Sequence, residues 1–290
     1  MVEFATGYVP SPDRPHLLEL SRARHGPRMA QLSAQEFPAR WDSRSLGLVP
    51  PVKSQGTCGA CWVFASTGAC EVALALAKQL SPASDTLSEE YSLDCCRNRG
   101  CGGDDPVVVL RWAQAQGLPT TAAYGPYKGQ PGYCSYKPGM KLYALADWGF
   151  ADAAGGQGVT PTPNIKAAIK TYGSSAVVLA ADRSFMNHPP GQVFDRTTST
   201  QANHAVLLVG WDDAKGQRGA WLLRNSWGAG WCDEGYIWIG YGVNLVGTEA
   251  LWASAGGAPP TPTPPADAVR MTLAGPLPAG EWLVTPAGPS

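Results

Sequence analysis

Charged residues are scarce in this sequence, and long apolar runs are missing. Asp, Glu, Lys and Arg make up 16% of the 290 residues, against roughly 25% in ordinary soluble domains. The formal net charge is −1. Lys and Arg are scattered rather than gathered into the basic patch that phosphate binding needs, so we expect no nucleic-acid partner. No stretch of about 18 apolar residues occurs, so we expect no membrane-spanning helix.

The first residues also lack the basic and then apolar regions of a signal peptide. Either the protein is not exported, or its signal has been removed. Cysteine, in contrast, is abundant: six of the eight cysteines fall between positions 58 and 101. Because such density is typical of proteins from oxidising compartments, we expect a secreted, periplasmic or lysosome-like location.

Proline-rich segments divide the chain. Residues 1–36 predict an extended N-terminal extension with one short helix near His16–Arg22, which is a candidate short pro-segment. Residues 37–255 predict one domain. A proline-rich linker follows at residues 256–265. Residues 266–290 are too short to form a core alone and predict a tail, a β-strand addition or the start of a truncated domain.

The order of the expected elements predicts an α+β fold with two lobes. The Ala- and Leu-rich run Cys61–Lys78 is apolar around most of its circumference and predicts a buried helix. The helical lobe is expected over about residues 45–150 and the β lobe over about 151–250, with a ligand site between them. The other expected elements are helices that start at Ser88, at Val107–Gln116 and at Asn164–Tyr172, and strands at Ala176–Ala180, Ala205–Trp211, Ala220–Leu223 and Tyr236–Ile239.

The strongest chemical signal surrounds Cys61. A thiol attacks a carbonyl only as the thiolate, and Cys61 opens the expected helix, where the helix dipole and the free N–H groups favour negative charge. A lone cysteine on a helix is more often structural, so the flanking residues decide. Residues 58–62 read CGACW and match the sequence pattern C-G-[SA]-C-[WY] of papain-type nucleophiles at every position.

His204 and Asn225 complete a candidate triad. His204 opens an apolar strand 143 residues after Cys61 (204 − 61), within the roughly 130–150 residues usual for papain-type enzymes. A general base needs a group that fixes its tautomer, and the side-chain oxygen of Asn225 is suited to accept an imidazole N–H. Trp227 then shields that bond from water. Taken alone, His204 is also consistent with a strand-edge histidine that has no catalytic role, and Asn225 with a turn residue.

With these residues in place, the chain from about Pro38 to Trp252 resembles the papain/cathepsin family of cysteine proteases. The resemblance implies a papain-like two-lobe fold, with a helical left lobe, an antiparallel β-barrel-like right lobe and the active-site cleft between them. It also implies peptide hydrolysis through an acyl-thioester on Cys61, a Cys61–His204 thiolate–imidazolium pair, and Gln55 as an oxyanion donor. Four segments carry the resemblance in the family's order: Gln55–Ser66, Cys95–Gly103, Asn203–Trp211 and Asn225–Gly235.

The resemblance assigns further roles by position. It implies two disulfides, Cys58–Cys101 and Cys95–Cys134, and a Cys70–Cys96 bridge with Cys232 left over is a guess for the rest. Zinc is the competing use of these sulfurs, but the second tight knuckle of a structural zinc site is missing, so we expect no metal and no cofactor. The residues expected to bind substrate are Gly103, Asp104, Asp105, Pro106, Val178, Asn203, Ala205 and Trp227.

Two acidic residues depart from the family pattern. Asp104 stands where the family has a second glycine, and Asp105 stands where it has an apolar or aromatic residue. In one reading, both are solvated loop aspartates. In the other, Asp105 lines the pocket for the side chain of the second substrate residue before the scissile bond. In the second case the pocket accepts basic or polar side chains.

The function expected is that of a monomeric cysteine endopeptidase acting on peptide or protein substrates. Neither a two-histidine occluding loop nor an exclusion domain is visible, so endopeptidase activity is the default. Residues 1–36 are expected to cover the cleft, which makes the chain a zymogen. The alternatives are a transferase that passes the acyl group to an amine, a non-catalytic binding homologue, and a metal-binding or redox protein. Product analysis with an amine nucleophile separates the transferase from the endopeptidase. Labelling of Cys61 by an epoxide separates the non-catalytic homologue from it.

Overall fold

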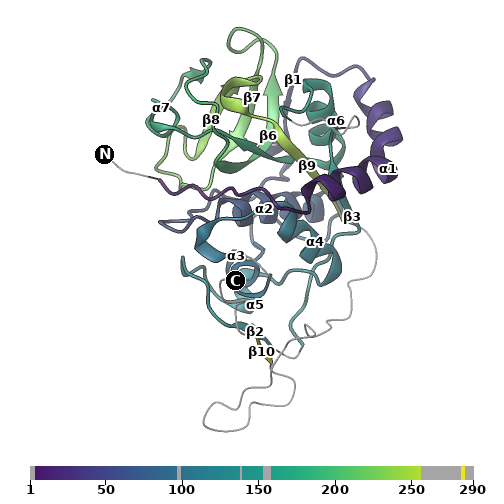
Figure 1. The fold of residues 1–290 in the computed structure, drawn as a ribbon, viewed down its shortest axis with the longest axis vertical. Coiled ribbons are helices and arrows are strands. Elements are labelled where there is room, and N and C mark those ends of the chain that lie inside the picture. Colours follow the sequence, from purple (N-terminus) through teal and green to yellow (C-terminus); the bar gives the residue numbers. More distant parts are fainter. Residues whose placement is uncertain (1–3, 97–98, 138, 153–157, 256–281, 285–290) are drawn as a thin grey trace.

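A helical lobe and a β lobe meet along a buried helix (Figure 1). The computed structural model describes residues 4–96, 99–137, 139–152, 158–255 and 282–284. The α+β two-lobe class is confirmed. The helices are α1 (Arg14–Ser33), α2 (Cys61–Leu76), α3 (Glu89–Cys95), α4 (Val107–Ala115), α5 (Thr121–Tyr124), α6 (Thr162–Tyr172) and α7 (Arg183–Met186), with 3₁₀ turns η1 (Ser43–Leu46), η2 (Gly100–Gly102) and η3 (Val243–Leu245). The strands are β1 (Arg40–Asp42), β2 (Cys134–Tyr136), β3 (Asp147–Phe150), β4 (Ser175–Leu179), β5 (Val193–Phe194), β6 (His204–Asp212), β7 (Ala220–Arg224), β8 (Tyr236–Gly240), β9 (Thr248–Ser254) and β10 (Trp282–Val284).

Helix α2 lies between the lobes and is buried along almost its whole length. Its sequence has no proline and is rich in alanine, which favours the helix and lets its neighbours approach closely. One face packs against β6 of the sheet and another against α4 of the helical lobe. Polar groups on α2 are satisfied internally: Ser66 Oγ, for example, donates to the carbonyl oxygen of Pro106 at 2.7 Å.

The β lobe is an eight-stranded sheet with the order β3-β9-β4-β6-β7-β8-β5, and β1 pairs with β6. The pairs are antiparallel, as expected, except β5–β8, which is parallel and includes a strand, β5, that the sequence did not predict. Strands β1 and β3 both belong to this sheet. The helical lobe therefore ends before Asp147 rather than near residue 150.

The N-terminal extension contains far more helix than the sequence predicted. Instead of a short helix near residues 16–22, α1 spans 20 residues and packs against α6 and β3. Its buried side chains include Leu17, Ser21, His25 and Met29, which repeat every four residues. Two of these four are polar, so the stripe does not register as an apolar periodicity. Pro15 is tolerated in the first turn of α1, because backbone N–H groups there have no partner within the helix. Pro27 lies inside the same helix.

Both disulfides that the resemblance implies are present, Cys58–Cys101 and Cys95–Cys134. The zinc alternative is wrong for Cys58 and Cys101, because their two sulfurs are bonded to each other in a disulfide. The Cys70–Cys96 bridge is also wrong, since both residues are buried thiols. Within the described residues, no cluster of three candidate metal ligands occurs, and none of the helices is long and apolar enough to cross a bilayer. The two disulfides fit an oxidising compartment.

The proline-rich segment 256–265 lies outside the described residues, and of the tail only β10 is described. Strand β10 pairs antiparallel with β2 of the helical lobe. These three residues therefore add a strand to the helical lobe, which was one of the three alternatives for the tail.

A buried ion cluster joins the loop before α2 to α2 and α3. Lys53 Nζ lies 2.8 Å from Glu71 Oε1 and 2.6 Å from Glu89 Oε1. Glu71 Oε1 also accepts the backbone N–H of Leu87 at 2.8 Å. Because water is excluded, each charge depends on the others for its stability.

Replacing Glu71 with alanine should destabilise the protein by about 3–5 kcal/mol, because Lys53 then loses one of its two buried carboxylate partners. Urea denaturation of the otherwise unchanged chain measures this loss. The matched control is Arg40→Ala, since the Arg40–Asp212 pair is solvent-exposed on the arginine side and such pairs contribute about 1 kcal/mol or less. Equal losses for both variants would contradict the assignment.

Candidate active site

Cys61 is the first residue of α2 and is completely buried. Burial raises the pKa of its thiol to about 11, opposed by backbone N–H groups that hydrogen-bond toward the sulfur, chiefly those of Ala205 and Gly7. Ala205 directly follows His204 at the start of β6, so the sulfur faces the opposite lobe at the histidine position. In this covered form the thiol is neutral, because a thiolate would have to be stabilised without water.

His204 is held by Asn225 and covered by Trp227. The His204 Nε2 atom lies 2.8 Å from Asn225 Oδ1, and the Trp227 ring stacks on the imidazole at 4.5 Å. Burial lowers the pKa of His204 to about 4, although the bond to Asn225 acts in the opposite direction. The other ring nitrogen, Nδ1, is buried and has no hydrogen-bond partner among the described residues. The Cys61–His204 ion pair that the resemblance implies stays a prediction, and in the covered form burial disfavours both of its charges.

Gln55 lies beside Cys61 and is fixed from two sides. Its Oε1 atom accepts the hydroxyl of Ser226 at 2.6 Å, and its backbone N–H donates to Ser226 O at 2.8 Å. Its Nε2 atom therefore faces the cleft, where it donates to Cys58 O at 2.9 Å and to the carbonyl oxygen of Ala5 at 3.2 Å. An amide held in this way is already oriented to bind a carbonyl oxygen.

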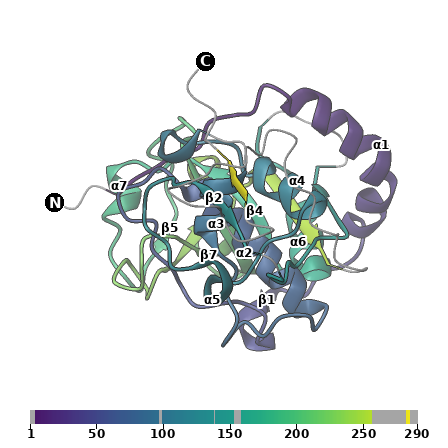
Figure 2. The ribbon, with the colours of Figure 1, turned by 90° about the horizontal axis from the view of Figure 1, so that it is seen from below.

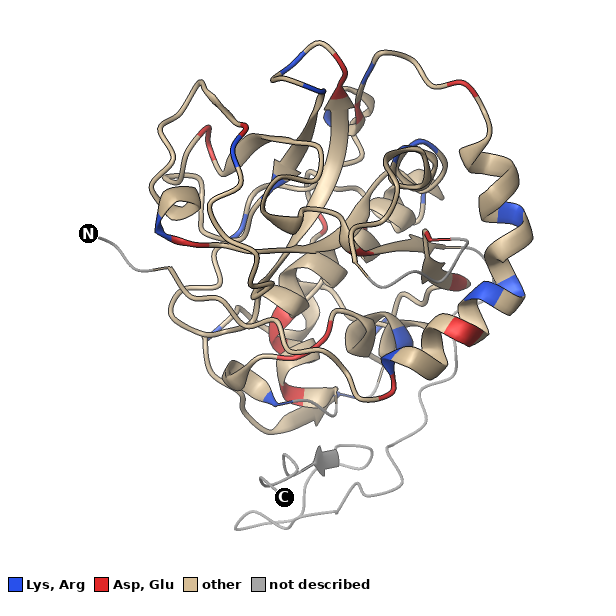
Figure 3. Ribbon diagram, turned by 45° about the horizontal axis from the view of Figure 1, so that its top comes forward, with Lys and Arg blue, Asp and Glu red and all other residues tan. Residues whose placement is uncertain are grey.

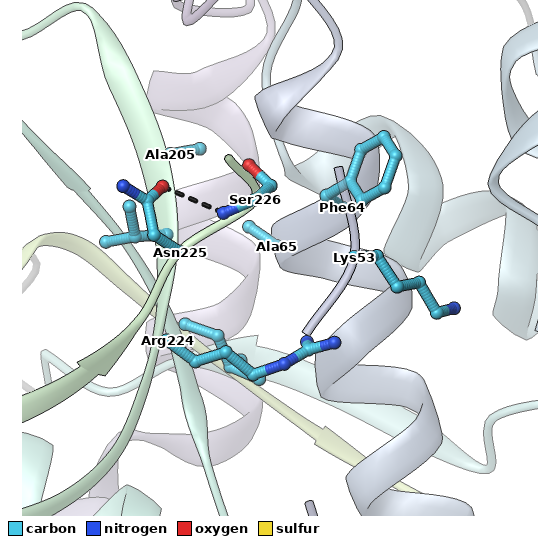
Figure 4. Close-up of a pocket in the computed structure, with 9 residues that line it drawn as sticks. Lys53, Phe64, Ala65, Ala205, Arg224, Asn225 and Ser226 are labelled. Atoms are coloured by element: carbon cyan, nitrogen blue, oxygen red, sulfur yellow. Dashed lines mark hydrogen bonds between the residues drawn. The ribbon is translucent and has the colours of Figure 1, made fainter. Parts of the chain in front are cut away.

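A small internal cavity of about 10 Å³ lies behind the triad, between α2 and strands β6 and β7 (Figure 4). Asn225 and Ser226 line it, and the Asn225 Oδ1 atom accepts the backbone N–H of Ser226 at 2.8 Å. This second bond fixes the asparagine oxygen in the orientation that receives the His204 N–H. The remaining lining residues include Lys53, Phe64, Ala65, Ala205 and Arg224.

The N-terminal segment 4–9 lies in the cleft above Cys61, and Figure 1 shows it running between the lobes toward α1. Phe4 stacks on Trp227 at 4.7 Å, and the Ala5 carbonyl accepts the Trp227 Nε1 proton at 3.1 Å. Further along, Gly7 N donates to Asn203 O at 3.2 Å. Tyr8 then pairs with Asp104 as a parallel β-bridge.

Three glycines permit this close approach. A Cβ atom on Gly7 would lie 1.9 Å from the carbonyl oxygen of Gly59, and one on Gly103 would lie 2.4 Å from Gly7 O. Gly103 also has φ +89°, which disfavours any side chain. A backbone without side chains at these positions is therefore needed for the segment to pass over Cys61.

The structure brings most of the expected substrate-binding residues to the cleft. Asp104 N donates to Gly7 O at 2.9 Å, and Asp104 O accepts from Val9 N at 3.2 Å, so this residue pairs through its backbone. Gly103, Asn203 and Trp227 also contact the segment, as described above. Ala205 directs its N–H at Cys61. Pro106 and Val178 are buried and make no hydrogen bond to the segment among the described residues.

The interpretation of Asp104 and Asp105 as solvated loop residues is wrong. Both are buried, and Asp105 is only 1% exposed. The Asp105 carboxylate accepts the backbone N–H groups of Ser11 and Val107, each at 2.9 Å. Burial raises the pKa of this carboxyl group above its usual range.

Glu249 is a site residue that the sequence reasoning missed. It receives the hydroxyl of Tyr8, and Arg14 Nε lies 2.6 Å from its Oε1 atom. Burial and nearby Asp105 raise the pKa of Glu249 to about 7, although Arg14 lowers it. The only sequence signal for Glu249 was that it is a single acidic residue in the apolar run of β9. A register shift between Ala176 and Val178 and a φ of 54° at Glu249 mark a bulge, which redirects such a side chain.

Comparison with known proteins agrees with this geometry. A family model described as "Papain family cysteine protease" matches residues 37–254. The chain is 32% identical over 223 residues to pro-cathepsin H of Bos taurus, covering 74% of this chain and 63% of that protein. It is 33% identical over 215 residues to cathepsin O of Mus musculus, covering 73% and 65%. The aligned region is therefore less than two thirds of the length of these relatives.

Solved structures give the same result. Digestive procathepsin L2 from the larval midgut of Tenebrio molitor superposes with a TM-score of 0.67 at 31% identity, covering 76% of this chain and 69% of that one. Bromelain from Ananas comosus, in complex with the E64 inhibitor, gives 0.65 at 27% identity, covering 76% and 100%. The chain belongs to the papain family of cysteine proteases.

His204 should stay neutral in the intact chain until the pH falls to about 4. Histidine NMR signals recorded from pH 8 to pH 3 measure this, and His204→Gln assigns the signal by removing it. Because the folded pKa lies below the unfolded value near 6.5, the unfolded chain takes the proton first. The contribution of neutral His204 to the free energy of unfolding is therefore fully present above pH 6.5 and is lost as the pH falls toward 4. A His204 midpoint at or above 6.5 would contradict the buried geometry.

Proposed function

We propose that this protein is a cysteine endopeptidase that hydrolyses peptide bonds through an acyl-thioester on Cys61. One observation carries the proposal: the thiol at the N-terminus of a buried helix receives the backbone N–H of Ala205, next to a histidine whose Nε2 is bound to Asn225 and whose Nδ1 has no hydrogen-bond partner among the described residues. Nδ1 is thus the nitrogen available to exchange a proton with the sulfur. Family membership and the length of the match from residue 37 to residue 254 support the same activity.

The reaction follows from these positions. The Cys61 thiol gives its proton to His204, and the sulfur attacks the carbonyl carbon of the scissile bond. The oxygen of the tetrahedral intermediate is bound by the Cys61 backbone N–H and by Gln55 Nε2. His204 then protonates the leaving amine, which leaves an acyl-thioester. A water molecule that gives its proton to His204 hydrolyses this ester and restores the thiol.

We infer further that the N-terminal segment holds the enzyme as a zymogen. The leaving amine must depart beside His204, on the side of Trp227, so the acyl part of a substrate extends toward Asp104. The segment runs the opposite way, with Ala5 at Trp227 and Tyr8 at Asp104. A peptide in this reversed direction occupies Gln55 and covers Cys61, but it does not present a carbonyl carbon with its amine toward His204.

Gly7→Val should open the cleft, because its Cβ atom would overlap the carbonyl oxygen of Gly59. We expect alkylation of Cys61 by iodoacetamide and turnover of a fluorogenic peptide to rise about 10- to 100-fold, which corresponds to about 1–3 kcal/mol of overpacking. Pro10→Ala, at an exposed position of the same segment, is the matched control. A chain that begins at Pro38 gives the fully open reference, and Cys61→Ala gives the inactive one. If the intact chain and the Pro38 chain are equally active, the segment is not inhibitory.

The pocket that Tyr8 fills supports a preference for basic side chains at the second residue before the scissile bond. Its walls carry Asp105 and Glu249, and the zymogen places the Arg14 guanidinium against Glu249. Once the N-terminal extension leaves, Glu249 loses both Tyr8 and Arg14, and Asp105 loses Ser11 but keeps the backbone N–H of Val107. A lysine or arginine of the substrate would restore a charge-assisted hydrogen bond there.

Glu249→Gln should lower kcat/KM for a peptide with arginine at that position by about 10- to 100-fold, the value of a charge-assisted hydrogen bond. A matched phenylalanine peptide should change little. In the parent enzyme the arginine preference should weaken as the pH falls through the Glu249 pKa, which is about 7 in the covered form, because the protonated acid no longer attracts a cation. Asp105→Leu separates the contribution of the pocket wall. An unchanged preference in both variants would refute the assignment.

A further inference from the structure

Asn244 is a completely buried residue in the turn η3. Its φ of 46° and ψ of 38° lie in the left-handed region, which asparagine tolerates better than most residues with a side chain. An amide that is removed from water needs hydrogen-bond partners inside the protein. The partners of Asn244 therefore identify the segments that it holds together.

The Asn244 side chain binds the irregular loop of residues 197–203, which leads directly into His204. Its Oδ1 atom accepts the backbone N–H groups of Thr198 at 2.7 Å and of Ser199 at 3.3 Å, and its Nδ2 atom donates to the Thr198 hydroxyl at 3.2 Å. Residues 197–203 contain no charged residue, whereas other loops of the β lobe do (Figure 3). Neutral hydrogen bonds therefore have to fix this loop.

Two asparagines bind the two residues that follow β4. Asn244 Nδ2 donates to the carbonyl oxygen of Ala180 at 2.8 Å, and Ala180 N donates to Asn244 O at 2.7 Å. Ala181 N donates to Asn203 Oδ1 at 2.8 Å, and Asn203 Nδ2 donates to Ala181 O at 3.0 Å. Asn203 directly precedes His204, so this pair of alanines links Asn244 to the start of β6.

A second set of bonds leads from the same loop to α7, which lies on the opposite side of the molecule from α1 (Figure 2). The Thr198 hydroxyl donates to Asp182 Oδ1 at 3.0 Å, and the same oxygen accepts the backbone N–H of Phe185 at 3.1 Å. The Phe185 ring lies 5.9 Å from the ring of Trp227, which covers His204. The loop that Asn244 holds is therefore connected both to the residue before the imidazole and to the ring that stacks on it.

We propose that Asn244 is a positioning residue for His204. By fixing residues 197–203, its amide sets where β6 begins, and so where the imidazole lies relative to Asn225 and Cys61. The inference rests on the proposed catalytic role of His204 and goes beyond it. Among the described residues, Asn244 makes no hydrogen bond to His204, Cys61 or the segment 4–9, so it acts only through the loop.

The loop also places a backbone acceptor in the cleft. The Asn203 carbonyl oxygen accepts the N–H groups of Gly7 at 3.2 Å and of Tyr8 at 3.0 Å. A movement of residues 197–203 would therefore displace this oxygen and the imidazole together. Because a misplacement of reacting groups by about 1 Å can lower a rate about 100-fold, the amide of Asn244 is expected to matter for turnover as well as for stability.

Three variants of the full chain test the proposal. Asn244→Gly deletes the amide and leaves the turn unstrained, because glycine adopts positive φ freely. Thr198→Val is a milder variant that keeps the shape of the side chain and removes the hydroxyl that contacts Asp182. Asn164→Ala is the matched control: this asparagine of α6 is also buried, and its Nδ2 atom also donates to a backbone carbonyl oxygen, that of Ala151, at 2.8 Å.

Three measurements separate positioning from general stability. Histidine NMR signals recorded from pH 8 to pH 3 give the His204 midpoint, which is about 4 in the parent chain. Urea denaturation gives the stability of every variant. Turnover of a fluorogenic peptide gives kcat and KM, measured on full chains that also carry Gly7→Val so that the cleft can open.

We expect Asn244→Gly to move the His204 midpoint from about 4 toward its ordinary value near 6.5, because a released loop lets water reach the imidazole. The same substitution should lower kcat about 10- to 100-fold and change KM less. Thr198→Val should shift both quantities in the same direction by a smaller amount, and it decides the case alone if the glycine variant does not fold. Asn164→Ala should lose stability with the His204 midpoint and kcat unchanged.

A His204 midpoint that stays at the parental value in both loop variants would overturn the proposal. An equal shift in Asn164→Ala would also overturn it, because general loosening of the β lobe would then explain the effect. The NMR measurement needs no turnover. A parent chain that binds no substrate and cleaves no peptide therefore counts against the peptidase assignment alone, while the His204 midpoints still test the role of Asn244.

Discussion

The contact between α2 and β6 is the constraint on which the rest of the structure depends. Each lobe supplies half of the site: α2 begins at Cys61, and β6 begins at His204. The packing of these two elements fixes the distance between the lobes, and small residues such as Ala65 and Ala205 line the internal cavity between them. The ion cluster around Lys53 joins the loop before α2 to α2 and α3. The active site is therefore a property of the lobe interface rather than of either lobe.

The chemistry of the covered cleft follows from this burial. Water is excluded from Cys61 and His204, so burial favours the neutral thiol and the neutral imidazole of the pair that we propose as catalytic. Opening the cleft admits water and allows the thiol proton to move from the sulfur to the imidazole nitrogen. The number of protons bound to the pair does not change. In the zymogen that we propose, one segment blocks substrate and suppresses the nucleophile at once. The glycines at positions 7 and 103 make this possible, because side chains there would hold the segment away from the sulfur.

Much of this could be predicted before the fold was known. Helix α2, the helix start at Ser88 and strands β4, β6, β7 and β8 were predicted to within about two residues, since their apolar runs are long and have clear boundaries. Strands β3 and β9 were missed because each is short or interrupted by a charged residue. Helix α1 was underestimated because its buried stripe contains Ser21 and His25, whose partners Phe150 and Trp252 lie far away in sequence.

The sequence by itself determined the candidate nucleophile, its candidate base and the residue proposed to orient the base, because the chemistry demands particular residue types in a fixed order along the chain. Only the tertiary structure decided how these groups are charged, which way the N-terminal segment crosses them, and where α1 is anchored. Glu249 is the clearest example: a single acid in an apolar strand reaches the cleft only because a bulge in β9 redirects it. Burial, direction and distance arise from packing between remote segments, and no local pattern encodes them.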